Sequence, residues 1–212
     1  MFRILTFLLS TSLFCTAYAQ PGFKQLFNGK NFDGWKLTEE HQDAFKVVDG
    51  AIVAHGSRAH LFYDGPVGNH DFKDFELRMQ VKAEPNSNGG IFIHTQYQPT
   101  GWPDKGFEIQ VNNTYAKDPK KGGGIYSVKD NMEPPAKDGE WYEQTIIVQG
   151  HKVTTKINGK TIVEWEQPSD WQGLKDKPGV RLSSGTIALQ AHDPNSTVYY
   201  KNIRIKPLKS AS

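Results

Sequence analysis

The residues best able to do acid–base chemistry lie in runs that alternate apolar and polar side chains. Glu108 and Gln110 alternate with the apolar residues Phe107, Ile109 and Val111. Because a strand points successive side chains to opposite faces, Glu108 and Gln110 are predicted to share the face turned away from the core. A carboxylate there can act as a general base or acid, and an amide can bind a polar ligand. The same pattern is also typical of an ordinary solvated face, so it leaves both interpretations open.

A second run adds a histidine to that face. β-Branched Ile91 and Ile93 alternate with Phe92 and His94, a pattern that suits a strand better than a helix. If the two isoleucines face the core, His94 faces the same side as Glu108. A histidine, a carboxylate and an amide would then stand together on one sheet face.

A third run, near the C-terminus, carries Gln190 and His192. The two positions share one face of a strand because they are two residues apart. We expect this strand to be a near neighbour of the strand with Glu108. The side chains of His94, Glu108 and His192 would then converge on one hollow.

The elements that must position these residues are predicted to be short strands. Roughly a dozen such runs follow one another at regular turn spacing, and no amphipathic helix of useful length is apparent. The predicted strands include a hairpin at 45–53 around Asp49-Gly50, and runs at 74–83, 125–129, 140–150, 151–158, 160–166, 186–191 and 197–207, whereas 116–124 and 168–178 are predicted to be loops. The sequence therefore predicts an all-β fold, a two-sheet antiparallel sandwich of jelly-roll type.

The first residues are predicted to be a signal peptide that is removed from the mature protein. Arg3 precedes an apolar run at 4–14 and a small-residue cleavage site at 17–19, the pattern of secretory signals. A lipoprotein anchor on Cys15 is the alternative, but Phe14 stands where a small residue is expected. We therefore expect cleavage near Ala19 and a periplasmic or extracellular location.

The mature chain, residues 20–212, is predicted to form a single domain. Without Arg3, the formal charge of +2 becomes +1, which gives no electrostatic reason to expect nucleic acid as a partner. No segment after residue 20 is apolar enough to span a membrane. The only cysteine precedes the cleavage site, so the exported domain would lack disulfides, as suits a bacterial envelope protein better than a small stapled domain.

An ordered set of short motifs covers nearly the whole mature chain. The set comprises Leu26-Phe27-Asn28-Gly29-Lys30, Gly90-Ile91-Phe92-Ile93-His94, Gly106-Phe107-Glu108-Ile109-Gln110, Gly124-Ile125-Tyr126, Gly139-Glu140-Trp141, Asn158-Gly159-Lys160, Ile187-Ala188-Leu189-Gln190-Ala191-His192 and Tyr200-Lys201-Asn202-Ile203-Arg204-Ile205-Lys206. Together they resemble the 3-keto-disaccharide hydrolase domain family, which is similar in fold to concanavalin A-like lectins and glucanases. The chain departs from many members at His94, where they have Arg, and at 191–193, where they have Asp-His-Gly.

The resemblance implies an enzyme that cleaves 3-keto-glycosides by hydrolysis or lyase chemistry. Ordinary glycoside hydrolysis needs two carboxylates across the scissile bond, and glucanases of this fold place both on one strand. Here the matching strand offers Glu108, then Gln110, then Asn112, so the second carboxylate is missing. A 3-ketone acidifies the C2 proton, so a single base can start elimination of the C1 oxygen, and water can then add back.

The roles implied for individual residues follow from that chemistry. Glu108, His94 and His192 are the candidate catalytic residues, and Gln110, Tyr126, Lys129, Gln190 and Trp102 are the candidate substrate-binding residues. Trp102 would stack on a sugar ring, although it could equally be a rim residue that covers the core. A divalent metal on His94, Glu108 and His192 would suit the two-histidine, one-carboxylate pattern, but no short-spaced metal motif is present.

The competing hypothesis is a non-catalytic carbohydrate-binding module or lectin of the same fold, because fold alone does not decide function. The sequence assigns neither the sugar nor the choice between hydrolase and lyase. It also gives no role to His55, Arg58 and His60, which lie between predicted elements.

Overall fold

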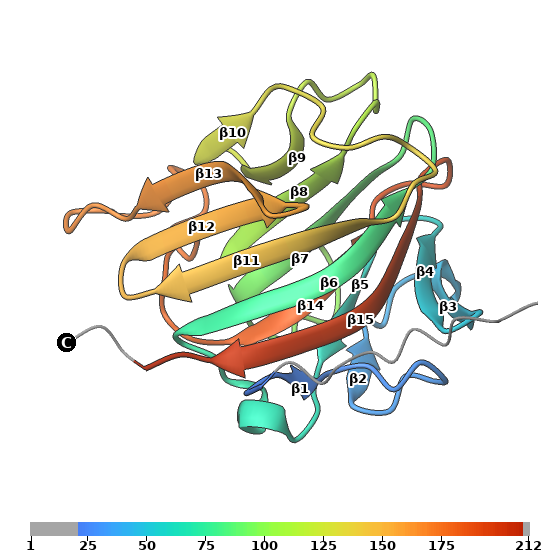
Figure 1. Cartoon of the computed structure of the whole chain (residues 1–212), viewed down its shortest axis with the longest axis horizontal. Coiled ribbons are helices and arrows are strands. Elements are labelled where there is room, and N and C mark those ends of the chain that lie inside the picture. Colours follow the sequence, from blue (N-terminus) through green and yellow to red (C-terminus); the bar gives the residue numbers. More distant parts are fainter. Residues whose placement is uncertain (1–20, 210–212) are drawn as a thin grey trace, which may run out of the picture.

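The computed structural model describes residues 21–209, which fold into two antiparallel β-sheets packed face to face (Figure 1). The strands are β1 Lys24–Gln25, β2 Trp35–Leu37, β3 Phe45–Val48, β4 Ala51–His55, β5 Ala59–Tyr63, β6 Phe75–Ala83, β7 Asn88–Thr95, β8 Phe107–Asn112, β9 Lys121–Ile125, β10 Lys129–Asn131, β11 Tyr142–Gln149, β12 Lys152–Ile157, β13 Lys160–Glu166, β14 Thr186–Ala191 and β15 Thr197–Pro207, with short 3₁₀ turns at Gln42–Ala44 and Val67–His70. The predicted two-sheet antiparallel β-sandwich of jelly-roll type is confirmed. The predicted signal peptide falls on residues outside the described range.

The two sheets differ in strand order. The eight-stranded sheet runs β13-β12-β11-β6-β15-β4-β3, with β1 added beside β15, and the seven-stranded sheet runs β10-β9-β8-β7-β14-β5-β2. In Figure 1 the long strands β11, β6 and β15 cross in front of β7, β8 and β14. Strands distant in sequence are therefore neighbours: β14 lies between β7 and β5, which brings residues near 190 beside residues near 60 and 90.

The core lies between the sheets because each long strand turns one apolar set inward. In β6, Phe75, Leu77, Met79 and Val81 are fully buried, while the alternating positions point outward. The same alternation buries Phe107, Ile109 and Val111 of β8. The outward positions of β8 are therefore fixed as Glu108, Gln110 and Asn112 by the period of two.

Tight turns fix the register of two hairpins. Asp49 and Gly50 both have positive φ, 50° and 75°, and join β3 to β4; Asn158 and Gly159, at 49° and 79°, join β12 to β13. Two residues with positive φ form the turn that matches the twist of an antiparallel pair. The hairpin predicted at 45–53 is confirmed.

The prediction for residues 116–129 is partly wrong. The strand here is β9, Lys121–Ile125, and residues 126–128 form a turn instead of continuing the strand. The sequence did not indicate this strand because it contains a run of three glycines, and glycine normally weakens a strand. Gly123 allows close approach instead: a side chain there would lie 3.0 Å from Ile162 of β13.

One strand carries an extra residue. Thr186 of β14 pairs with Thr95 of β7, and Ala188 pairs with Phe92. Between these two pairs β14 advances by two residues and β7 by three, so β7 contains a bulge. His94 has a φ of 52°, and this bulge inverts the alternation of β7 beyond Ile93. Within residues 21–209, no helix has the length and apolar character needed to cross a bilayer.

Candidate active site

A cleft of about 290 Å³ lies over the outer face of the seven-stranded sheet. Its walls come from β7, β8 and β14 and from the segments that follow β7, β8, β9, β13 and β14. It is lined by Asn88, Phe92, Trp102, Glu108, Gln110, Asp118, Tyr126, Lys177, Gln190 and His192. The structure thus brings together six of the eight residues predicted from sequence: Glu108, His192, Gln110, Gln190, Tyr126 and Trp102.

Glu108 is the carboxylate on the floor of this cleft. Gly90 of the neighbouring strand leaves the space for it, because a Cβ at Gly90 would lie 2.5 Å from Glu108 Oε1. Gln190 Nε2 donates a hydrogen bond to Glu108 Oε1 at 2.9 Å. Burial raises the pKa of Glu108 to about 7, although the hydrogen bond from Gln190 and the charge of Lys177 oppose this shift. A carboxylate with this pKa is suited to exchange protons near neutral pH.

Three amide side chains that line the cleft have unused hydrogen-bonding capacity. Asn88, Gln110 and Gln190 are at most 3% exposed, and their side-chain oxygens accept no hydrogen bond from the described residues. Buried polar atoms normally have partners, and such exceptions need an explanation. Acceptors on the floor of a cleft suit a ligand that brings many hydroxyl donors.

His192 is held in place by a carboxylate. Its Nδ1 lies 2.8 Å from Asp193 Oδ2, which also accepts a hydrogen bond from Ser196 Oγ at 2.8 Å. Burial acts to raise the pKa of Asp193, but hydrogen bonds from His192, Ser196 and Asn195 outweigh it and lower that pKa. The ionised Asp193 fixes the proton on Nδ1 of His192, so Nε2 is the nitrogen left for chemistry.

Trp102 forms one wall of the cleft, and its loop is fixed from behind. The Trp102 ring packs against the His192 ring, with centroids 5.6 Å apart, and the Arg58 guanidinium lies 5.5 Å from its centroid. Arg58 donates two hydrogen bonds to Glu40, and Glu40 Oε1 accepts another from Gly101 N at 2.8 Å. This network gives Arg58 a role that the sequence left unassigned: it holds the loop that carries Trp102.

Tyr126 stands at the opposite side and is paired with Asp118. Burial, together with the negative charge of Asp118 and a hydrogen bond to it, raises the pKa of Tyr126 to about 12, so the phenol keeps its proton. The Asp118 carboxylate also accepts a hydrogen bond from Lys120 N at 2.9 Å. The Lys120 ammonium lies 3.9 Å above the Tyr126 ring, which fixes the ring from its outer side.

The structure does not bring His94 into the cleft, so its predicted orientation is wrong. Its side chain is buried at the far end of β7, where Nε2 lies 2.8 Å from Lys73 O and Nδ1 accepts a hydrogen bond from Ser183 N at 3.2 Å. Its ring also packs against Phe75 of the other sheet, with centroids 5.7 Å apart. The physical reason is the bulge, which turns His94 toward the core.

Lys129 also lies apart from the cleft. It begins β10, the edge strand, where its side chain is exposed, and the cation that lines the cleft is Lys177. The predicted metal set of His94, Glu108 and His192 does not assemble, because His94 points elsewhere. Across residues 21–209, no three His, Cys, Asp or Glu side chains group closely enough to hold a metal ion.

His60 lies beneath Trp102, next to the cleft. It pairs with Gln190 across β5 and β14, is fully buried, and neither ring nitrogen has a partner among the described residues. Its ring meets the edges of Phe92 and Trp102, with centroids 5.3 and 5.7 Å apart. Burial lowers the pKa of His60 to about 3, so the ring stays neutral at physiological pH and helps support Trp102.

The polar residues of the cleft that sequence reasoning missed are Asn88, Asp118 and Lys177. Asn88 begins β7 and shares the outward parity of Gly90 and Phe92, which is a signal that alternation could have given. Asp118 and Lys177 come from loops, and only the tertiary fold carries them to the cleft.

The site is a cleft on the outer face of a β-sandwich, with a floor of amides, an aromatic wall and one carboxylate, Glu108, of raised pKa. Residues 22–206 match the model of the 3-keto-alpha-glucoside-1,2-lyase-like domain family, and the chain belongs to that family. It is 27% identical to a 3-keto-disaccharide hydrolase of Bacteroides thetaiotaomicron over 88% of this chain and 79% of that protein.

Solved structures are similar over nearly the whole chain. A protein from Parabacteroides distasonis described as a "putative glycosyl hydrolase" has a TM-score of 0.75 and 25% identity, covering 89% of this chain and 94% of that one. A Bacillus subtilis protein of unknown function with a galectin-like fold has a TM-score of 0.61 at 12% identity, covering 89% and 96%. The second likeness concerns the fold alone.

Proposed function

We propose that this protein cleaves 3-keto-glycosides, with Glu108 as the base that removes the proton from C2 of the keto sugar. The observation that carries the proposal is the environment of Glu108: it lies on the floor of the cleft, accepts a hydrogen bond from Gln190, and burial raises its pKa to about 7. A general base is most effective when its pKa lies near the working pH. The family and the names of the relatives support the substrate class.

The reaction begins when the carboxylate of Glu108 takes the C2 proton, which the neighbouring 3-ketone acidifies. The electron pair of the C–H bond forms an enediolate across C2 and C3, with negative charge on the ketone oxygen. Lys177, whose charge already acts on Glu108, and the amide of Gln110 are the cleft groups suited to stabilise that oxyanion.

The second step breaks the bond between C1 and the glycosidic oxygen. The enediolate electrons form a C1–C2 double bond and restore the ketone, while the leaving oxygen takes a proton from Nε2 of His192. Asp193 favours this role, because its contact with Nδ1 holds the His192 ring so that Nε2 is the nitrogen left to face the leaving oxygen. If water then adds across the double bond, the net result is hydrolysis; if it does not, the enzyme is a lyase.

Ordinary glycoside hydrolysis is the second candidate, because a second carboxylate does line the cleft. Glu108 is the only carboxylate among the outward positions of β8, but Asp118 reaches the same cleft from a loop. The carboxylate of Asp118 already accepts hydrogen bonds from Tyr126 and Lys120, which suits a positioning role better than protonation of a leaving group.

Incubating the purified protein with methyl 3-keto-α-glucoside and with methyl α-glucoside separates these candidates. The proposal expects cleavage of the keto compound alone. Equal cleavage of both would favour the pair Glu108 and Asp118 acting as an ordinary glycosidase. Binding of either sugar without any cleavage would favour the binding-module hypothesis.

The proposal includes export. The charged start, the apolar run at 4–14 and the small residues at 17–19 form a signal-peptide pattern that directs the domain out of the cytoplasm. Mass spectrometry of the protein recovered from the periplasm should give the mass of a chain that begins at Gln20. A full-length chain confined to the cytoplasm would contradict this.

A further inference from the structure

His192 lies just beyond the end of its strand. β14 ends at Ala191, and its register pairs with β5 end at the same residue. The ladder of the sheet therefore does not fix the place of the His192 ring relative to Glu108 of β8. A proton donor must nevertheless be held within hydrogen-bond reach of the atom it protonates. Side chains from other elements must therefore hold the ring.

Two aromatic rings contact the His192 ring. The ring of Trp102, from the loop after β7, has its centroid 5.6 Å away. The ring of Tyr115, from the segment after β8, has its centroid 5.5 Å away at an interplanar angle of 70°. Tyr115 is buried, with 6% of its surface exposed. It takes no part in the chemistry proposed above, so its contact with His192 needs a separate explanation.

The hydroxyl of Tyr115 reaches the carboxylate that holds His192. It forms a hydrogen bond with Asp193. Burial, together with the negative charge of Asp193, raises the pKa of Tyr115, so the phenol keeps its proton and is the donor of this bond. Tyr115 thus contacts both members of the pair: its ring packs against His192, and its hydroxyl donates to Asp193.

Four donors occupy the Asp193 carboxylate, which offers about four lone-pair sites. Oδ1 accepts a hydrogen bond from Asn195 N at 2.9 Å. Oδ2 accepts one from Ser196 Oγ at 2.8 Å and lies 2.8 Å from Nδ1 of His192. Tyr115 is the fourth donor. The carboxylate cannot turn without losing one of these contacts, so it holds Nδ1 of His192 in one place.

Tyr115 and Ser196 are tied in turn to the two strands on either side of the cleft floor. Tyr115 N donates a hydrogen bond to Asn112 Oδ1 at 2.9 Å, and Asn112 ends β8, the strand that carries Glu108. Ser196 is 2% exposed, and its Oγ accepts a hydrogen bond at 2.9 Å from the backbone nitrogen of Asn88, which begins β7. The strand of the base and its neighbour thus also determine where the acid lies.

We propose that Tyr115 and Ser196 are positioning residues: by orienting Asp193, they hold the His192 ring so that Nε2 reaches the leaving oxygen of a substrate bound over Glu108. This inference rests on the proposed function and deepens it, because it assigns the side chains that control the leaving-group step. Neither residue touches the substrate. They act when the C1–oxygen bond breaks and leave the removal of the C2 proton unaffected.

The test compares two substrates that share the keto ring and differ in the leaving group. Methanol leaves only if its oxygen is protonated, whereas 4-nitrophenolate leaves without a proton. The measured quantity is the ratio of kcat for methyl 3-keto-α-glucoside to kcat for 4-nitrophenyl 3-keto-α-glucoside. Tyr115→Phe, which keeps the ring, and Ser196→Ala should each lower this ratio about 10-fold, as expected for the loss of one hydrogen bond to a charged group. KM should stay unchanged, because the lost contacts do not bind substrate.

Tyr97→Phe and Ser87→Ala are the matched controls, since they remove the same groups from other contacts. The Tyr97 hydroxyl donates to a backbone oxygen, and Ser87 Oγ accepts from a backbone nitrogen. Ser87 is as buried as Ser196, at 1% exposure. Both controls should leave the ratio unchanged.

An unchanged ratio in Tyr115→Phe and Ser196→Ala, or equal losses on both substrates, would overturn the positioning role and leave the proposed function standing. If the wild-type protein cleaves neither compound, the proposed function fails, and the NMR signal of the His192 Nδ1 proton decides the positioning role. A proton held against Asp193 exchanges slowly with water, so its signal should be sharp in the wild type and the controls and broadened in the two variants. The same signal in all these proteins, or none in the wild type, would overturn the role.

Discussion

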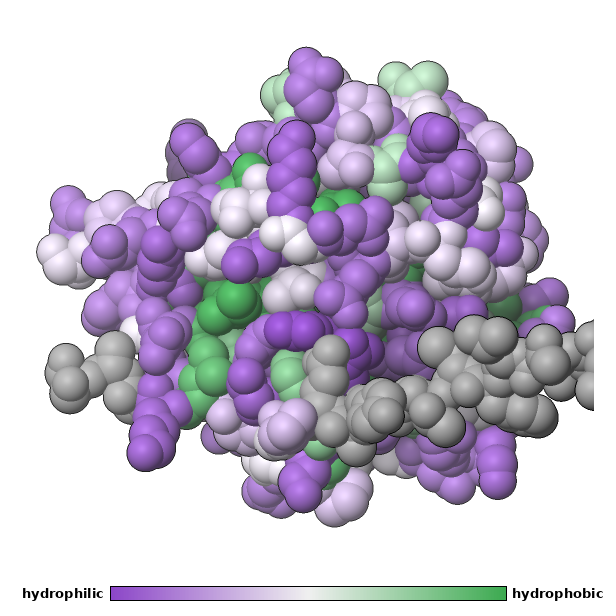
Figure 2. Space-filling view, viewed as in Figure 1, coloured by the Kyte–Doolittle hydropathy of each residue, from purple (hydrophilic) through white to green (hydrophobic). Residues whose placement is uncertain are grey.

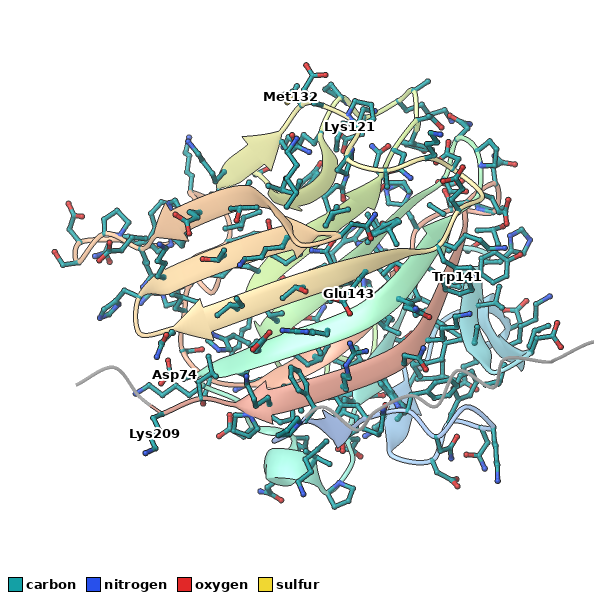
Figure 3. The ribbon with its side chains drawn as sticks, in the orientation of Figure 1. Asp74, Lys121, Met132, Trp141, Glu143 and Lys209 are labelled. Carbon is teal, nitrogen blue, oxygen red and sulfur yellow. The ribbon has the colours of Figure 1, made fainter. Side chains whose placement is uncertain are left out.

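The outer faces of the two sheets are built by the same alternation but are used differently. On the eight-stranded sheet, charged side chains pair across strands: Lys206 Nζ lies 2.9 Å from Glu76, and Arg204 donates to Glu143 at 2.7 Å. Figure 3 shows Glu143 on the open face of β11, and Figure 2 shows this side of the molecule as largely hydrophilic. On the seven-stranded sheet, one carboxylate lies in a cleft among amides.

This difference in pairing indicates which of the two polar sheet faces is a candidate binding site. Side chains that satisfy one another leave nothing for a ligand to bind, whereas buried groups with unused hydrogen-bonding capacity call for a partner such as an ordered water or a ligand. Burial raises the pKa of Glu108 to about 7, but the pKa of Glu76 is lowered: its burial is outweighed by hydrogen bonds from Lys206 and Arg78. One face thus stabilises its charges, and the other holds a carboxylate close to its protonated form.

The largest expected effect comes from removing the carboxylate of the cleft. Glu108→Gln keeps the shape and the contact with Gln190 but removes the base, so kcat on a 3-keto-glycoside should fall by about 10²–10⁴. In the wild-type protein, kcat/KM should rise with pH through about 7, because the base must be deprotonated. Stopped assays over a pH series measure both quantities.

Glu143→Gln is the matched control for that experiment, since it makes the same change on the other sheet. It should leave kcat and the pH profile unaltered. A variant Glu108→Gln that keeps full activity, or a wild-type profile without a rising limb near pH 7, would remove Glu108 from the role of base.

The next effect is on stability, and its sign is opposite to the effect on activity. The pKa of Glu108 rises from 4.5 to about 7 on folding, so the folded state favours the protonated form. The stability that the folded state gains from binding this proton is fully present below pH 4.5 and is lost as pH rises through 7. At pH 8, Glu108→Gln should therefore increase the free energy of unfolding by about 3 kcal/mol at most.

Urea titrations at pH 4 and pH 8 measure this difference. At pH 4 the two proteins should be nearly equally stable, because the carboxyl is protonated in both the folded and unfolded states. A variant less stable than wild type at pH 8 would show that the ionised carboxylate is held by favourable contacts, as on the opposite sheet.

How far the sequence could predict this site depends on the regularity of each strand. Alternation placed Glu108, Gln110 and the pair Gln190 and His192 on one face, because β8 and the end of β14 have no bulge there. It failed for His94, since one extra residue in β7 inverts the face and no local pattern marks it.

The remaining parts of the site depend on tertiary structure. Asp118 and Lys177 lie in loops whose path is set by packing against distant elements, so no spacing rule places them at the cleft. Lys129 was misplaced for a related reason: the chain turns after Ile125, and Lys129 begins a separate edge strand. The fold itself could be predicted because strand periodicity and turn residues recur along the whole chain.

The smallest expected effect concerns the outer face of the eight-stranded sheet, where charged side chains form ion pairs. Glu143→Gln removes the ion pair with Arg204, whose side chains are 34% and 15% exposed. Such pairs lie in contact with solvent, and screening and side-chain entropy offset most of their attraction. The free energy of unfolding should therefore fall by less than about 1 kcal/mol, and the deficit should shrink as salt is raised. Urea titrations in low and high salt measure it. A loss of several kcal/mol that salt does not reduce would mean that this face, too, holds a buried charge that depends on one partner. Pairing of charges would then no longer distinguish the outer faces of the two sheets.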